Sequence, residues 1–231
     1  MNEVAQAFTL CRWANPVEAP FTEAVFLFDS DDLPEDLSNA SVVLRDRGAE
    51  RARDLLTRGA ARVLLGDAAL KDSGVVASLA KEIGTEKVGL WVPVRRMTVS
   101  WALDTVSNAD FSCITPSRGK LAWEALLSNG TPTGADVTWW ITQMFERGAS
   151  MALIAADLHD DADLNICAEI AEQHGSRLWL TPLSRPDAPL RPWVEFGHVR
   201  NLVLPVGEPC HAEKMAALVQ MFTPMEASAT A

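Results

Sequence analysis

The stretch from Leu55 to Leu70, LLTRGAARVLLGDAAL, contains the end of a helix, a buried strand and the loop that follows the strand. Gly59 stands where the C-terminal cap of a helix requires a positive φ. The segment Ala61–Leu65 is a short apolar run, typical of a parallel strand that is covered on both faces. This order of helix, glycine and buried strand predicts a fold of alternating β and α elements.

A close copy of this stretch occurs from Met144 to Asp157, MFERGASMALIAAD. Residues 58–60 and 147–149 are both Arg-Gly-Ala, and each tripeptide precedes an apolar strand that runs toward an aspartate. Two copies of one helix–glycine–strand unit indicate a βα repeat fold.

The composition is typical of one globular domain, which we expect to span residues 1–231, because 48% of the residues are hydrophobic and 22% are charged. A formal net charge of −11 makes nucleic acid and anionic membranes poor partners. No apolar run reaches the roughly 18 residues of a membrane span, and the N-terminus lacks the basic segment of a secretory signal. The four cysteines are far apart, so we expect no zinc site, no disulfide framework and a cytoplasmic location.

Eight short apolar segments predict strands, at 7–13, 24–28, 41–44, 62–65, 87–94, 150–155, 177–180 and 201–206. The segments between them predict helices at 49–58, 68–83, 136–147, 163–174, 193–196 and 211–222. The connection after the first strand is too short for a full helix, and the prolines of 182–192 prevent a long helix after the seventh strand. This order predicts a (β/α)8 barrel with shortened helices 1 and 7, and an open doubly wound sheet is the alternative.

Residues 95–134 interrupt the alternation after the fifth strand. The run MTVSWALDTV alternates weakly and predicts a hairpin strand, whereas Gly, Pro, Asn and Thr residues punctuate Ser117–Gly134 and predict a loop. We expect this inserted segment at the C-terminal face of the barrel, where ligand-binding loops lie.

The run Gly59–Asp72, GAARVLLGDAALKD, resembles the fourth strand and loop of the ProFAR isomerase family of histidine biosynthesis, the HisA/HisF-like barrels. The runs Val25–Asp32, Lys87–Leu90 and Gly148–Asp161 resemble the second, fifth and sixth strands of that family. The resemblance implies a HisA-like barrel. It also implies two acid–base carboxylates, after strands one and five, and two phosphates bound on loops after strands three, four, seven and eight.

The chain departs from this pattern at the positions that matter for the family's chemistry. The first strand offers Cys11-Arg12-Trp13 without a carboxylate, and Trp91 stands where the second carboxylate falls, although an indole cannot transfer that proton. In the phosphate loops, the family's glycines and threonine are replaced by Arg45-Asp46, Asp67, Pro182-Leu183 and Glu208-Pro209. Gly66 and Gly207 remain. We therefore expect a divergent member that does not isomerise ProFAR.

Five arginines follow or end predicted strands, at positions 12, 45, 47, 95 and 96. Together they predict a positive site for a carboxylate or phosphate. The alternative is a set of structural ion pairs with Asp29, Asp46, Asp67 and Asp157. The substrate-binding residues that we predict are Arg12, Asp29, Arg45, Gly66, Asp67, Arg95, Arg96 and Gly207.

The acidic run Asp157–Asp163, DLHDDAD, follows the sixth predicted strand. We predict Asp157 and His159 as catalytic residues because the end of the strand directs them toward the mouth of the barrel. Asp160 or Asp161 is predicted to cap the next helix instead. Cys11 or Cys210, with His211 as base, is an alternative nucleophile, although a lone cysteine is more often a small buried apolar residue.

Two functions are compatible with these features. The first is a biosynthetic enzyme or binding protein for a small anionic metabolite. The resemblance implies this role, because some HisA-like relatives are linked to one-carbon and pterin or furan cofactor pathways. The second is a catalytically silent barrel that serves as a partner or scaffold subunit, with exposed tryptophans shaping its interface. We assign no metal and no cofactor, because the sequence lacks G-x-G-x-x-G and Walker A motifs, and we allow for a homo-oligomer.

Overall fold

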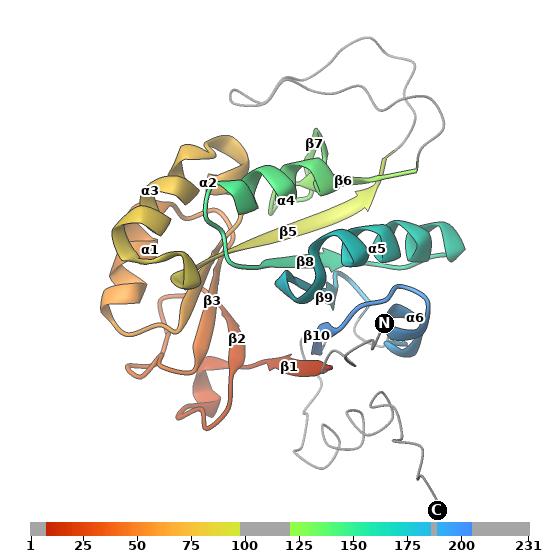
Figure 1. Cartoon of the computed structure of the whole chain (residues 1–231). Helices are drawn as coiled ribbons and strands as arrows, with labels where there is room; N and C mark the ends of the chain where they lie inside the picture. The colour runs from red at the N-terminus through yellow and green to blue at the C-terminus, as the bar shows by residue number, and fades with distance from the viewer. Residues whose placement is uncertain (1–7, 98–120, 186–188, 205–231) are drawn as a thin grey trace, which may run out of the picture.

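The fold is a closed barrel of eight parallel strands, as the sequence predicted (Figure 1). The computed structural model describes residues 8–97, 121–185 and 189–204. The barrel strands are β1 (Thr9–Trp13), β2 (Val25–Phe28), β3 (Ala40–Leu44), β4 (Arg62–Leu65), β5 (Val88–Arg96), β8 (Ala152–Ala156), β9 (Leu178–Pro182) and β10 (Asn201–Leu204). Parallel pairing of β4 with β5 and of β10 with β1 completes the ring, which excludes the open doubly wound sheet.

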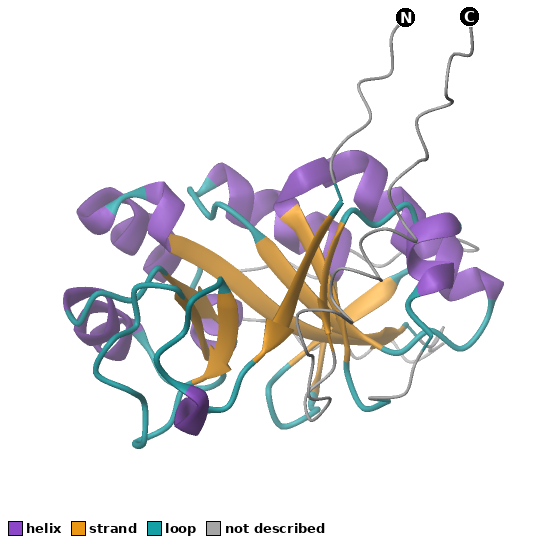
Figure 2. Ribbon diagram, turned by 90° about the horizontal axis from the view of Figure 1, so that it is seen from below, coloured by secondary structure: helices purple, strands orange, loops and turns teal. Residues whose placement is uncertain are grey.

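Helices lie outside the strands, which converge at the centre of the molecule (Figure 2). They are α1 (Ala49–Thr57), α2 (Asp67–Lys71), α3 (Gly74–Ile83), α4 (Val137–Glu146), α5 (Asp161–His174) and α6 (Arg191–Glu195). Three short 3-10 turns accompany them, namely η1 (Pro16–Glu18), η2 (Thr85–Lys87) and η3 (Gly175–Arg177). Between β1 and β2 there is only η1, and α6 is a single short helix, so the shortened connections 1 and 7 are confirmed.

Two boundaries differ from the sequence prediction because polar side chains redirect the backbone. The predicted helix 68–83 is broken into α2 and α3 at Asp72, whose backbone is extended and whose Oδ1 accepts the N–H of Gly74 at 2.8 Å. Helix α5 begins earlier than predicted because Asp160 caps it, accepting the N–H of Ala162 at 2.9 Å and that of Asp163 at 3.3 Å.

The prediction of a loop over 117–134 was wrong, because its described part contains a β-hairpin. Strands β6 (Trp123–Leu126) and β7 (Pro132–Asp136) are antiparallel, and β6 pairs with the end of β5. Gly130 turns the chain between them with a φ of +84°. The hairpin strand predicted within MTVSWALDTV falls mostly on residues outside the described ranges, as does the helix predicted at 211–222.

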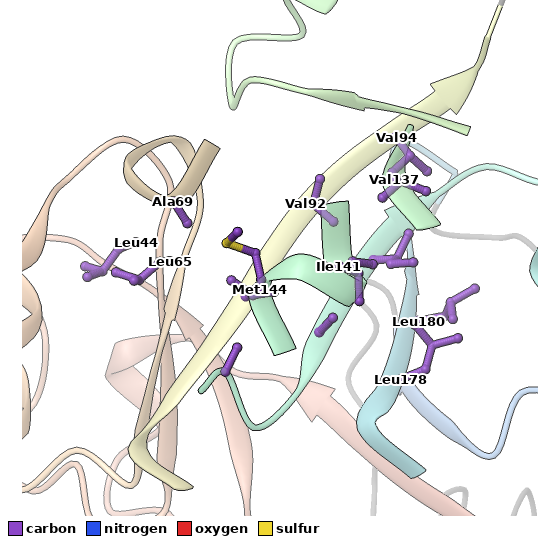
Figure 3. Close-up of a cluster of buried hydrophobic side chains, with 14 of the residues drawn as sticks. Leu44, Leu65, Ala69, Val92, Val94, Val137, Ile141, Met144, Leu178 and Leu180 are labelled. Carbon is purple, nitrogen blue, oxygen red and sulfur yellow. The ribbon is translucent and has the colours of Figure 1, made fainter. Parts of the chain in front are cut away.

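Two layers of apolar side chains stabilise the barrel. The outer layer packs between strands and helices: Val137, Ile141 and Met144, spaced along one face of α4, lie against β5 beside Val92 and Val94 (Figure 3). The inner layer takes alternate residues from all eight strands, since successive side chains of a strand point to opposite faces. Its members are Cys11, Trp13, Phe26, Phe28, Val43, Leu64, Trp91, Met151, Leu153, Ala155, Trp179 and Val203.

The sequence repeat corresponds to two matching βαβ units, β4–α3–β5 and β8–α5–β9. Gly59 and Gly148 precede the first strand of each unit with φ of +93° and +103°. Gly84 and Gly175 end the helix of each unit, also with positive φ, and a 3-10 turn leads from each into the second strand. The helix–glycine–strand unit inferred from the sequence is therefore the building block of the barrel.

We predict that Gly148→Ala destabilises the protein more than Gly59→Ala. Both substitutions impose a positive φ on alanine, which costs on the order of 1–2 kcal/mol. A Cβ at Gly148 would also lie 2.8 Å from the Cβ of Ala80, whereas a Cβ at Gly59 meets nothing within 4 Å. Urea denaturation of the two variants measures the difference, and equal losses would contradict the packing argument at Gly148.

Candidate functional site

Aromatic side chains fill the interior of the barrel and its mouth, at the C-terminal ends of the strands. Trp13 and Phe28 end β1 and β2, and their rings stack with centroids 4.1 Å apart and planes inclined by 12°. Trp91 of β5 meets Phe28 edge to face at 6.0 Å. The indole Nε1 of Trp13 donates to Oγ1 of Thr181, on β9, at 3.0 Å. The floor of the mouth is therefore apolar and aromatic.

The mouth has one arginine that is not neutralised by a carboxylate in the described part of the chain. Arg45 follows β3 and is exposed, and its guanidinium lies over the ring of Phe28, 3.9 Å from the centroid. This is the geometry of a cation–π contact, which contributes about 0.5–1 kcal/mol at an exposed site. Arg45, Phe28 and Trp13 thus form a stack of a cation on two aromatic rings.

Gly66 brings the loops after β3 and β4 into contact at this edge of the mouth. The N–H of Gly66 donates to the carbonyl of Leu44, and the N–H of Asp67 donates to that of Arg45 at 2.8 Å. A Cβ at Gly66 would lie 2.5 Å from the carbonyl oxygen of Arg45 and 3.2 Å from Cε3 of Trp91. Gly66 is therefore required for packing, and it fixes the backbone that places Arg45.

The other four arginines of the predicted rim form intramolecular ion pairs. Arg12 binds Glu18 at 2.6 Å and Glu23 at 3.0 Å. Arg47 contacts Asp29 and Asp31, and Arg95 binds Glu124 on the β6–β7 hairpin at 3.0 Å. Arg96 binds Asp160 and Asp163 at the start of α5. The structure therefore does not bring the five arginines together as one anion site.

The predicted acidic binding residues are also held by the protein itself. The carboxylate of Asp29 is 3% exposed and binds Arg51 of α1 at 2.8 Å. The carboxylate of Asp67 accepts the backbone N–H of Ser128 at 2.7 Å and its hydroxyl at 3.1 Å, which ties α2 to the hairpin turn. Gly207 lies outside the described residues, as do Cys210 and His211.

Asp157 and His159 follow β8 but do not contact each other through hydrogen bonds among the described residues. Asp157 accepts the N–H groups of Leu183 and Ser184 at 3.1 and 3.0 Å and also the hydroxyl of Ser184, and so organises the loop after β9. The backbone N–H of His159 donates to Asp163, and its side chain is exposed. Their catalytic role stays a prediction.

Asp163 is the centre of a buried polar cluster that the sequence analysis did not identify. Its side chain is 1% exposed and accepts from Nε of Arg96 at 3.1 Å and from Nε1 of Trp123 at 3.0 Å. The hydrogen bonds from Arg96 lower the pKa of neighbouring Asp160 to about 2. The cluster thus joins the end of β5, the hairpin and the start of α5.

Cys11 has the structural role expected of a lone cysteine. It lies in the inner layer of the barrel, and burial, together with the charge of Glu23, raises the pKa of its thiol to about 11. The thiol is protonated at neutral pH, so Cys11 is not an activated nucleophile. Among the described residues, no group of three or more His, Cys, Asp and Glu side chains could hold a metal ion.

The structure also explains part of the tryptophan content. Trp13, Trp91 and Trp179 line the barrel interior, while Trp123, Trp140 and Trp193 are fully buried outside it. Trp139 is partly buried, so none of the tryptophans in the described ranges is exposed, and the expected interface of exposed tryptophans is wrong there. Trp13 and Phe28, at the ends of the first two strands, are the sequence signal that indicates the aromatic floor.

Comparison with known proteins supports the same fold. No family model matches the chain. It is 30% identical over 132 residues to the imidazole glycerol phosphate synthase subunit HisF of Methanosphaerula palustris, covering 54% of this chain and 47% of that protein. The HisF of Dictyoglomus thermophilum is 26% identical over 111 residues, 48% of this chain and 36% of that protein.

The chain resembles the HisA/HisF-like barrels. The matches span about half the length of these relatives or less. Together with the closed ring of parallel strands, they confirm the barrel fold and the resemblance to HisA/HisF-like barrels that the strand motifs indicated. In the described ranges, no helix is long and apolar enough to cross a membrane.

We predict that Arg96→Gln lowers the free energy of unfolding by about 3 kcal/mol at pH 7, because it leaves the buried carboxylate of Asp163 without its cation. Arg96 also pairs with Asp160, whose pKa it lowers to about 2, so the contribution of the Arg96–Asp160 pair is complete above the ordinary pKa of 3.8 and is lost as the pH falls through about 2. The difference in unfolding free energy between the wild type and Arg96→Gln should therefore become smaller as the pH is lowered toward 2.

Urea denaturation at pH 7 and in steps down to pH 2 measures this gap. Arg53→Gln is the matched control, since Arg53 pairs with Glu82 and both side chains are at least 40% exposed; its loss should stay within about 1 kcal/mol. A loss for Arg96→Gln as small as that of the control would show that the cluster does not stabilise the fold.

Proposed function

We propose that this barrel binds a small planar anion at its mouth, and that Arg45 supplies the charge that attracts it. The observation that supports this proposal is the stack of Arg45 on Phe28 and Trp13, since Arg45 alone of the five rim arginines has no carboxylate partner in the described ranges. In a chain of net charge −11, such a cation is a local site for a carboxylate or phosphate.

The shape of the proposed ligand follows from the surfaces that it would meet. A guanidinium presents a flat face and a fork of N–H donors, which suit a planar carboxylate better than a bulky group. Phe28 is partly exposed beside Arg45, whereas Trp13 and Trp91 are buried, so the apolar surface next to the guanidinium would pack against the edge of a flat ring. The indole N–H of Trp91 is buried and has no hydrogen-bond partner among the described residues, so it is an unused donor below the mouth.

The chemistry of ProFAR isomerases is not part of this proposal. No Asp or Glu stands at the inward-facing positions of the eight described barrel strands, and the resemblance puts Trp91 where the second acid–base group falls. Asp157, with His159 as its partner, is the proton-transfer residue that we propose instead. In Asp157→Asn the amide oxygen can still accept hydrogen bonds from the loop after β9, so turnover retained by this variant would exclude Asp157 as the acid or base.

A partner or scaffold subunit is the second candidate function. It is favoured by the internal pairing of the charged groups at the rim, which leaves few of them available to a substrate. The relatives that the chain matches are each described as a synthase subunit. A mass above that of one chain at micromolar concentration, or one stable partner recovered in constant ratio, would support this candidate against the metabolite-binding function.

We predict that Arg45→Ala weakens binding of a planar carboxylate at least tenfold, because it removes the cation from the mouth, about 1.4 kcal/mol or more. The probes are nicotinate and orotate as planar carboxylates, and ribose 5-phosphate as a non-planar anion. Binding is followed by fluorescence, which reports tryptophan alone because the chain has eight Trp and no Tyr.

Arg53→Ala is the control for the loss of one positive charge, because Arg53 lies on α1 away from the mouth and pairs with Glu82. A ligand present at a hundred times its dissociation constant should also raise the unfolding free energy by about 2.7 kcal/mol. Absence of binding by all three probes, or equal weakening in both variants, would reject the anion site at Arg45 and favour the partner-subunit function.

A further inference from the structure

A second hollow lies outside the barrel, between the last turns of α4 and α5 and the turn η3. Its volume is about 270 Å³, close to the lower limit of roughly 300 Å³ for ligand pockets, and it is open to solvent on one side. It is lined by Thr142, Phe145, Glu146, Gln173, His174 and Arg177. None of these residues belongs to the mouth of the barrel, so the hollow is independent of the function proposed above.

The polar groups of α4 and α5 fix the state of His174 in this hollow. The hydroxyl of Thr142 donates its proton to the carbonyl of Thr138 at 2.9 Å and accepts from Nε2 of Gln173 at 3.1 Å. Nε2 of His174 lies 3.5 Å from the same oxygen, so a hydrogen bond there requires the proton on Nε2. Burial and the charge of Arg177 lower the pKa of His174, which leaves the ring neutral, with Nδ1 as an acceptor.

Arg177 supplies the positive charge of the hollow. Its guanidinium lies over the ring of Phe145, 3.5 Å from the centroid, and donates to the backbone carbonyls of Ala149 and Ser150. These contacts use Nε and Nη2 and leave Nη1 without a hydrogen-bond partner among the described residues. No carboxylate there lies within ion-pair distance of Arg177 either. The guanidinium is therefore oriented by the protein but is not neutralised by it.

Glu146 and the C-terminal ends of α4 and α5 make one side of the same hollow negative. Glu146 is exposed, and only its Oε2 is engaged, by the side-chain amide of Gln143 at 3.2 Å. The residues that line the hollow come from the last turns of α4 and α5, where the helix dipole favours cations. A ligand with one charge would thus be attracted by one wall and repelled by the other.

From this arrangement we propose that the hollow between α4 and α5 binds a small zwitterion, namely an α-amino acid. The carboxylate of the amino acid pairs with Nη1 of Arg177. Its ammonium group lies toward Glu146 and Nδ1 of His174, where two acceptors and the helix ends meet. The charges of Arg177 and Glu146 are then both neutralised by one ligand, whereas a simple anion or a simple amine would neutralise only one of them.

The test follows the ring signals of His174 by NMR while the purified chain is titrated with each of the twenty common α-amino acids. A His174→Gln variant assigns those signals, and acetate and methylamine serve as singly charged controls. We expect at least one amino acid to shift the His174 signals saturably at concentrations up to about 10 mM. Glu146→Gln should weaken that binding at least tenfold and Arg177→Gln as strongly, while Glu82→Gln on α3 leaves it unchanged.

Glu146→Gln is the decisive variant, because Glu146 is exposed and its side chain accepts only from Gln143 among the described residues, whereas Arg177 also holds two backbone carbonyls. The proposal is overturned if no amino acid shifts the His174 signals, or if acetate or methylamine alone shifts them as strongly. It is equally overturned if Glu146→Gln binds the amino acid as tightly as the wild type does.

Discussion

Closure of the barrel depends on the pairing of β1 with β10, two short strands from opposite ends of the described chain. Four residue pairs, from Thr9 with Asn201 to Arg12 with Leu204, join them. Without this pairing, β1 and β10 would each present an unpaired edge, and the inner layer would be open to water. Because the ring is closed, alternate residues of every strand face an enclosed interior, where large apolar side chains are stable.

The same interior determines what the mouth can do. A barrel that catalyses proton transfer needs carboxylates or histidines projecting from the ends of its strands, whereas β1, β2 and β5 here supply Trp13, Phe28 and Trp91. These rings pack against one another and provide no group that could transfer a proton. The charged residues next to them mostly bind one another, so they hold the loops in place, and Arg45 is left facing outward on its aromatic support.

Much of the barrel could be predicted from the sequence because its strands are short apolar runs, several of which follow a glycine. The strand 62–65 was predicted with its observed bounds, and the glycines before β4 and β8 have the positive φ that their position required. The hairpin was missed although Asn129-Gly130, between two runs with apolar residues, is a typical turn signal. Of the aspartates expected to pair with the rim arginines, only Asp29 does so in the described ranges, with Arg47. The other partners could not be predicted, since ion pairs such as Arg96 with Asp163 join residues far apart in the chain.

The two matching βαβ units occupy neighbouring positions in the barrel, and the β6–β7 hairpin leaves the wall between them, after β5 and before β8. Each unit keeps its own glycines, its own helix and its direct strand pairing, because β5 still pairs with β8 across the junction. Extra sequence can therefore accumulate at this seam without altering the architecture on either side. A barrel assembled from such modules can acquire a new loop system at the joint while its wall remains continuous.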